Sequence, residues 1–149
     1  MNFVVDASLL IDAFSKYNME RRKLALSTLK KIEEYEIYAP RLAQVEFASV
    51  LSRFTPERAV EEFLGVFDFI TLVGEGEISQ DAIQIALKTH SRAADAYYIT
   101  TAKRFNAVLL TNDRRMAENA KLSGVTAIYV LEENKKLHDL THKKEEERN

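Results

Sequence analysis

Short apolar runs rich in β-branched residues alternate along the chain with longer stretches in which apolar residues recur every three or four positions. The short runs predict strands covered on both faces, because such strands are nearly continuous in apolar residues. The five predicted strands are Asn2–Val5, Ile37–Ala39, Phe69–Leu72, Ala107–Leu110 and Thr126–Val130. The predicted helices lie near Ala7–Lys16, Glu20–Tyr35, Leu42–Arg53, Pro56–Phe67, Glu77–Lys88, Arg92–Phe105 and Arg114–Leu122. This alternation predicts an α/β fold, a three-layer α/β/α sandwich around a parallel sheet.

Local signals refine the ends of these elements. Thr55 followed by Pro56 is typical of a helix start, with threonine as the cap and proline at the first helical position. Ser91 is the expected cap of the helix before the fourth strand. Glu75 and Glu77 are expected in a loop that Gly74 and Gly76 make flexible.

Composition limits the class of protein. The chain has 149 residues with 21 Lys+Arg, 23 Asp+Glu, a net charge of -2 and no cysteine. This length fits one domain with one hydrophobic core. The absence of cysteine excludes disulfides, a thiol nucleophile and a cysteine-based zinc or iron–sulfur site. The balanced charge argues against a uniformly basic nucleic-acid binder, yet it leaves room for a nuclease with an acidic, metal-filled site.

The sequence also predicts where the protein works. Its longest apolar stretches fall far short of the ~20 residues that a spanning helix needs. The N-terminal Met1–Asp6 has neither a basic region nor a long apolar region, so we expect no signal peptide. These features favour a cytoplasmic protein that does not engage a membrane.

The last part of the chain differs in composition from the rest. We expect one folded domain over residues 1–131, followed by a strongly charged C-terminal tail over residues 132–149. The tail is expected to be solvated and mobile. His138 and His142 lie four residues apart and would share a helix face, but a third metal ligand in register is missing.

Two acids stand at the ends of predicted strands. Asp6 follows the apolar run Phe3-Val4-Val5, and Asp113 follows the fourth strand. Either residue alone is equally well explained as the N-cap of the next helix.

Two further acids interrupt the apolar faces of helices. Glu46 lies between Leu42 and Val50 at helical spacing, and Asp95 shares a face with Tyr98 and neighbouring apolar residues. Asp95 also suits the first turn of its helix, where the helix dipole favours an acid. Glu46 has no such alternative, and a buried carboxylate is costly unless it is paired or bound to metal.

The topology of a parallel sheet brings these four acids together. Asp6 and Asp113 end strands, while Glu46 and Asp95 lie early in helices whose N-terminal ends meet the same sheet edge. Open α/β sheets bind ligands at that edge. Four converging carboxylates repel one another unless a cation intervenes, and hard oxygen ligands favour Mg²⁺ or Mn²⁺.

Other sheet-based chemistries fail on inspection. The chain has no glycine-rich phosphate loop of either common type, and only four glycines in all. No Ser/His/Asp triad is suggested, because His90 is the only histidine outside the tail. Asp12, six residues after Asp6, is expected to face solvent or Lys16.

These motifs resemble the PIN domain family, most closely the small VapC-type toxins of toxin–antitoxin pairs. The resemblance rests on Asp6-Ala7-Ser8-Leu9-Leu10-Ile11-Asp12, Glu46 in its helix, Ala94-Asp95-Ala96 and Leu110-Thr111-Asn112-Asp113, and it extends over residues 1–131. It implies a five-stranded parallel sheet in the order 3-2-1-4-5. It also implies that Asp6, Glu46, Asp95 and Asp113 are catalytic and bind metal.

The same resemblance assigns supporting roles near these acids. Ser8 and Thr111, with Asn112 beside them, would orient carboxylates or water, although capping of the following turns explains the two hydroxyls equally well. Many family members carry a fifth acid shortly after the last aspartate. Here those positions read Arg114-Arg115-Met116, so the sequence offers no fifth ligand.

The activity that the resemblance implies is metal-dependent endoribonuclease cleavage of RNA. Bound Mg²⁺ or Mn²⁺ would activate water and stabilise charge on the scissile phosphate, leaving a 5′-phosphate and a 3′-hydroxyl. Arg92, Arg114 and Arg115 lie close in sequence to the acids and are candidates for phosphate contact. Each of them is also explained as a solvent-exposed helix residue.

The resemblance further implies a small antitoxin partner and self-association as a homodimer. The segment from Phe54 to Phe69 is richer in Phe and Leu than one core stripe needs, which is consistent with an interface. Two other functions remain open from the sequence. One is a housekeeping PIN nuclease in RNA processing or DNA trimming, and the other is a PIN-like scaffold that binds without cutting.

Overall fold

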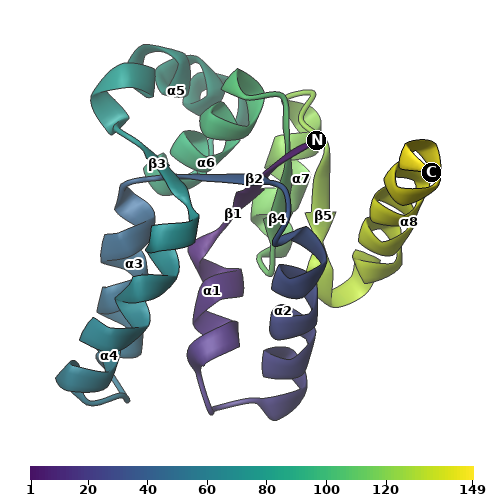
Figure 1. Ribbon diagram of the computed structural model, residues 1–149. Helices are drawn as coiled ribbons and strands as arrows, with labels where there is room; N and C mark the ends of the chain where they lie inside the picture. The colour runs from purple at the N-terminus through teal and green to yellow at the C-terminus, as the bar shows by residue number, and fades with distance from the viewer.

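A five-stranded parallel sheet forms the centre of the molecule, described here by a computed structural model of residues 1–149 (Figure 1). Its strands are β1 (Asn2–Val5), β2 (Glu36–Pro40), β3 (Thr71–Val73), β4 (Ala107–Thr111) and β5 (Ala127–Tyr129). They pair side by side in the order β3-β2-β1-β4-β5. The α/β class, the parallel sheet and the strand order 3-2-1-4-5 expected from the sequence are therefore confirmed.

Eight α-helices and one 3₁₀ helix connect and cover the strands. They are α1 (Ala7–Phe14), α2 (Met19–Ile32), α3 (Leu42–Leu51), α4 (Glu57–Phe63), η1 (Leu64–Phe69), α5 (Glu75–Thr89), α6 (Ala93–Arg104), α7 (Arg114–Leu122) and α8 (Val130–Arg148). Helices α1 to α4 pack among themselves on one face of the sheet, and α8 joins them through α2. Helices α5, α6 and α7 pack on the other face (Figure 1). None of these helices has both the length and the apolar character that crossing a membrane requires.

The two central strands are the most deeply buried elements. All five residues of β4 are buried, as are Phe3, Val4 and Val5 of β1. Helices on both faces remove these strands from water, which explains their continuous apolar sequence. Val5 pairs with Leu110 at the end of β1, so the chain leaves both strands at the same level of the sheet.

The segment before β3 differs from its expected structure. Pro56 is the N-cap rather than the first helical residue, and α4 ends at Phe63, after which the chain continues as η1 to Phe69. Tertiary packing explains the change, because Phe67 turns inward to contact Phe47 edge to face at 5.5 Å between ring centroids. Phe69, expected in the strand, lies outside it and is 82% exposed.

Two helix starts also correct the sequence-based expectations. Glu75 and Glu77 lie in the first turn of α5 rather than in a loop, and the Glu75 carboxylate accepts a 2.6 Å hydrogen bond from the Leu42 amide at the start of α3. Arg92, not Ser91, is the N-cap residue of α6. A carboxylate that caps a helix 33 residues away leaves no local sequence signal.

The C-terminal segment is a helix whose first part packs on the fold, which differs from the free tail expected, while residues 142–149 are exposed. Helix α8 contacts α2, with Leu137 and Thr141 buried. Glu133 lies at a kink in α8, where its carboxylate contacts Lys121 at 2.9 Å, Lys136, and the Tyr129 amide at 3.1 Å. Burial of Leu137 and the ion pair of Glu133 with Lys121 thus join a mostly charged helix to the fold.

Candidate active site

Four elements place the acids at the carboxyl edge of the sheet. Asp6 directly follows β1 and Asp113 lies just after β4, while Glu46 is in the second turn of α3 and Asp95 is in the first turn of α6. Strands β1 and β4 are neighbours, and the connections leaving them run toward opposite ends of the sheet. This is the switch point at which open parallel sheets bind ligands.

Asp6 is held by two hydroxyl groups. It occupies the N-cap position of α1 but its side chain makes no capping hydrogen bond. Instead, Ser8 Oγ donates to Asp6 Oδ2 at 2.7 Å and Thr111 Oγ1 donates to the same oxygen at 2.6 Å. The capping explanation therefore fails for Asp6, and neither hydroxyl occupies Oδ1.

The charge state of Asp6 reflects this environment. Burial raises the pKa of the Asp6 carboxyl above its ordinary value. The hydrogen bonds from Thr111 and Ser8 oppose that increase in pKa, while the negative charge of Asp113 adds to it. A buried carboxyl next to a second carboxyl favours a cation that both could share.

The loop after β4 is fixed by the same hydroxyls. The Asn112 amide donates to Ser8 Oγ at 3.1 Å, and the Asp113 amide donates to Thr111 Oγ1 at 2.9 Å. Asp113 Oδ1 accepts a hydrogen bond from the Met116 amide at 3.2 Å, so this residue does cap α7. The other oxygen of Asp113 faces Arg92. Asp113 therefore caps α7 with one oxygen and directs the other toward Arg92.

Asp12 supports this loop from α1, which corrects its expected exposure to solvent or Lys16. Arg21 donates to Asp12 Oδ2 through Nη2 at 2.8 Å and through Nε at 3.0 Å. The Asn112 side-chain amide donates to the same oxygen at 2.6 Å. Asn112 thus supports the acids indirectly, by tying the loop to Asp12. The sequence gives one indication of the contact between Asp12 and Asn112. Asp12 lies four residues after Ser8 and so shares its helix face, and Ser8 also contacts Asn112.

Tyr98, for which no site role was expected, joins Glu46 to α6 and α1. The Tyr98 hydroxyl donates to Glu46 Oε1 at 2.8 Å and accepts a hydrogen bond from the Ala7 amide at 3.2 Å. Burial raises the pKa of Glu46, the Tyr98 hydrogen bond opposes the increase, and the charges of Asp6 and Asp95 reinforce it. Tyr98 lies three residues after Asp95 on the same helix face, and this spacing is the feature of the sequence that indicates a position near the acids.

Arg92 lies across the other two acids. Its Nη2 is 2.8 Å from Asp113 Oδ2 and 3.2 Å from Asp95 Oδ1. Burial raises the pKa of Asp95, the positive charge of Arg92 opposes this, and the charge of Asp113 adds to it. The Arg92 side chain itself is 65% exposed, so a cation at the surface of the site bridges two acids beneath it.

The other two candidate arginines behave differently. Arg114 pairs with Glu132 and stacks over the Tyr129 ring at 5.4 Å, so it engages none of the four acids directly. Arg115 is exposed, and its charge lowers the pKa of Asp95. Arg92 and Arg115 are thus the basic residues whose charges act on the acids.

The chemistry of these side chains fits a hard divalent cation. Every donor is a carboxylate oxygen, and the pKa values of Asp6, Glu46 and Asp95 are each raised by burial and by the charge of at least one other acid in the group. No three of the side chains converge on one point as a finished metal cage. Hydrogen bonds to Tyr98 and Arg92 set the present orientations of Glu46, Asp95 and Asp113. His138 and His142 pack edge to face and gain no third ligand.

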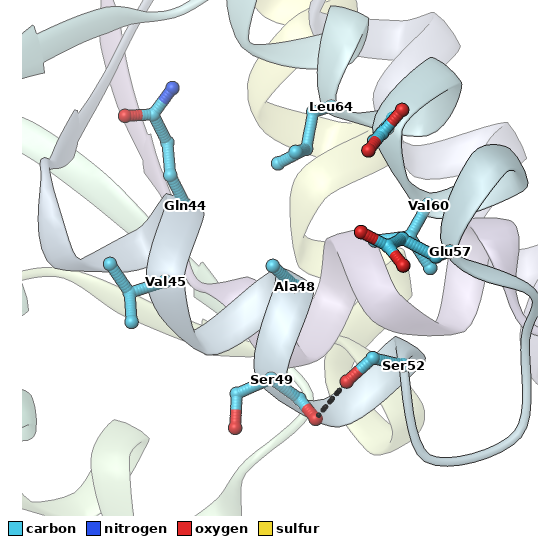
Figure 2. Close-up of a pocket in the computed structure, with 9 residues that line it drawn as sticks. Gln44, Val45, Ala48, Ser49, Ser52, Glu57, Val60 and Leu64 are labelled. Atoms are coloured by element: carbon cyan, nitrogen blue, oxygen red, sulfur yellow. Dashed lines mark hydrogen bonds between the residues drawn. The ribbon is translucent and has the colours of Figure 1, made fainter.

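An apolar groove lies between α3 and the α4–η1 segment, separate from the acids (Figure 2). It has a volume of about 820 Å³. Val45 and Ala48 line it from one side and Val60 and Leu64 from the other (Figure 2). The segment from Phe54 to Phe69 is divided between core and surface, since Phe67 is buried while Phe54 is 58% exposed.

The acids thus lie at the switch point of an open parallel sheet, the place where α/β proteins of this kind bind ligands. The family model described as "PIN domain" matches residues 3–122. The chain therefore belongs to the PIN domain family, whose members are nucleases. A comparison with curated proteins gave no significant match.

Solved structures show the same fold at low sequence identity. PAE2754 from Pyrobaculum aerophilum has a TM-score of 0.64 and 20% identity, covering 88% of this chain and 86% of that chain. VapC20 from Mycobacterium tuberculosis, described as a sarcin-ricin loop cleaving toxin, has a TM-score of 0.67 and 11% identity, covering 78% and 93%. VapBC2 from Rickettsia felis, bound to a promoter DNA fragment, has a TM-score of 0.61 and 14% identity, covering 86% and 98%.

Proposed function

We propose that this protein is a divalent-metal-dependent endoribonuclease and the toxin component of a toxin–antitoxin pair. The observation that carries the proposal is the gathering of Asp6, Glu46, Asp95 and Asp113 from four separate elements at the switch point of a PIN fold. An RNA substrate is supported by the fold likeness to a toxin that cleaves the sarcin-ricin loop.

The four acids would hold one or two Mg²⁺ or Mn²⁺ ions. When bound, such a cation supplies an activated water and stabilises negative charge on the scissile phosphate. Ser8 and Thr111 orient Asp6 by donating to its Oδ2, which leaves Oδ1 for another partner. Asn112 fixes the loop that carries Asp113.

The arginines provide the contact to RNA. Arg92 is largely exposed above Asp95 and Asp113, where its remaining N–H groups can bind a phosphate oxygen. Arg115 adds positive charge near Asp95. Arg114 would join them at the outer side of the site, next to Glu132.

We assign the partner surface to the groove between α3 and α4. Four apolar side chains line it together with polar ones, and Val45 among them is 69% exposed. Several structures with this fold are toxin–antitoxin complexes, including VapBC2. A small antitoxin and a second copy of this chain are the two partners proposed.

Cleavage of RNA tests the proposal. Single-stranded and structured RNA should be cut by the wild-type protein in Mn²⁺ or Mg²⁺ but not in EDTA, and the products should carry a 5′-phosphate. Asp95→Asn removes one acid without changing side-chain size and should lose the activity. Cleavage in EDTA, or equal cleavage by Asp95→Asn, would show that the acids are not the site.

A further inference from the structure

Tyr98 ends at the acidic site although its ring belongs to the core. The residue is fully buried, and its side chain extends from α6 so that the hydroxyl meets both α1 and α3. One neighbour is the amide of Ala7, next to Asp6, and the other is the carboxylate of Glu46. A single phenol oxygen therefore connects three of the elements that carry the acids.

The direction of this hydrogen-bond chain is fixed by its donors. The Ala7 amide lies in the first turn of α1, where backbone N–H groups lack an acceptor within the helix, and the Asp6 side chain does not cap it. It donates to the Tyr98 oxygen instead. A neutral phenol has one proton, and Tyr98 directs it to Glu46 Oε1.

This arrangement restricts the conformation of the Glu46 side chain. Glu46 is only half-buried on α3, and a glutamate side chain otherwise samples many rotamers. Donation from Tyr98 holds Oε1 and favours the charged carboxylate, while Oε2 remains without a protein partner in the hydrogen-bond network.

We propose that Tyr98 is a positioning residue, whose hydroxyl holds the Glu46 carboxylate in the acidic group so that Glu46 contributes to divalent-cation binding. This inference rests on the proposed metal-dependent function. It assigns to Tyr98 a role through Glu46, distinct from its role in filling the core.

Calorimetric titration with Mn²⁺ tests the role of Tyr98. Tyr98→Phe removes only the hydroxyl, and loss of a hydrogen bond that orients a metal ligand typically weakens binding by about tenfold or more. Tyr97→Phe is the matched control, because Tyr97 is the adjacent tyrosine and its hydroxyl makes no hydrogen bond within the protein. Its affinity for Mn²⁺ should equal that of the wild type.

A double-mutant cycle separates positioning from packing. In a Glu46→Ala background, Tyr98→Phe should change Mn²⁺ affinity by less than about twofold, because the two residues act as one unit. An equal loss in both backgrounds, or no loss in Tyr98→Phe alone, would overturn the inference. If Tyr98→Phe does not fold, Glu46→Asp replaces it, since the shorter side chain keeps its charge but withdraws from the hydroxyl. Wild-type affinity in Glu46→Asp would also overturn the inference.

The outcome also distinguishes this inference from the proposed function. If the wild-type protein itself takes up no Mn²⁺, the metal-dependent function fails and the role of Tyr98 fails with it. If the wild type binds Mn²⁺ and Tyr98→Phe binds it equally well, the function stands and only the positioning role is lost.

Discussion

Arg92 Nη2 lies 2.8 Å from Asp113 Oδ2, although the two residues are 21 positions apart in the sequence. The same guanidinium group also contacts Asp95. Two acids proposed to bind metal are thus partly neutralised by a cation from the chain itself. In the proposed function Arg92 would therefore have opposite effects on the two ligands, since its charge would repel a metal ion and attract a phosphate.

Replacing Arg92 by alanine should separate these effects. Removal of a positive charge next to Asp95 and Asp113 should strengthen Mn²⁺ binding by about 1 kcal/mol, or roughly fivefold, given the exposure of the side chain. The KM for RNA should rise by a similar factor. Calorimetry and cleavage kinetics measure the two quantities, with Arg58→Ala as an exposed control that makes no ion pair. Weaker Mn²⁺ binding in Arg92→Ala would contradict this interpretation.

Asp6 should reduce the stability of the metal-free protein. Burial raises the pKa of Asp6 in the folded protein, so folding favours the protonated carboxyl. The stabilisation that this gives is fully present below the pKa of the unfolded chain, about 3.9, and is lost as the pH rises through the pKa of the folded protein. In EDTA at pH 7, Asp6→Asn should therefore raise the free energy of unfolding by about 1 kcal/mol. The difference from wild type should vanish near pH 3.5.

Denaturant unfolding of both proteins across this pH range measures the effect. Asp81→Asn, which changes an exposed aspartate on α5, is the charge-matched control and should show no such difference. A less stable Asp6→Asn protein at pH 7 would mean that the Asp6 carboxylate stabilises the fold rather than the cation site.

Glu133 should have the opposite pH dependence. Hydrogen bonds from Lys121 and Lys136 lower the pKa of the Glu133 carboxyl to about 2 in the folded protein. The charged Glu133 therefore stabilises the fold above the pKa of the unfolded chain, about 4.5, and this stabilisation is lost as the pH falls through about 2. Glu133→Gln should lower the free energy of unfolding by about 1 kcal/mol at pH 7. Thermal unfolding between pH 7 and pH 2 measures this loss, and a difference that persists unchanged at pH 2 would point to a contribution other than charge.

The sequence was sufficient for the sheet and for the positions of the four acids. Continuous apolar strands and the alternation with helices specify a parallel sheet, and the sheet edge then brings Asp6 and Asp113 together without any long-range information. The strand order, which the family resemblance alone implied, is confirmed by the pairing of the strands.

Only some of the contacts that orient these acids could be predicted. The bond from Tyr98 to Glu46 joins residues 52 positions apart, and the bond from Thr111 to Asp6 joins residues 105 apart. The Thr111–Asp6 pair follows from the register of β1 and β4 and was expected from the family resemblance. The Tyr98–Glu46 pair depends instead on how α6 docks against α3, which local spacing does not specify. The same holds for η1 and α8, whose structures depend on burial of Phe67 and Leu137 against distant parts of the core.

Titration with Mn²⁺ tests most directly whether the acids form a divalent-cation site. Calorimetry at pH 7 should show saturable binding to the wild-type protein and to Asp81→Asn, and no measurable binding to Asp6→Asn. Repeated at lower pH, the titration of the wild type should show weaker binding as the raised pKa values of Asp6, Glu46 and Asp95 are reached and the carboxyls take up protons. Absence of binding to the wild type, or equal affinity in Asp6→Asn, would contradict the account.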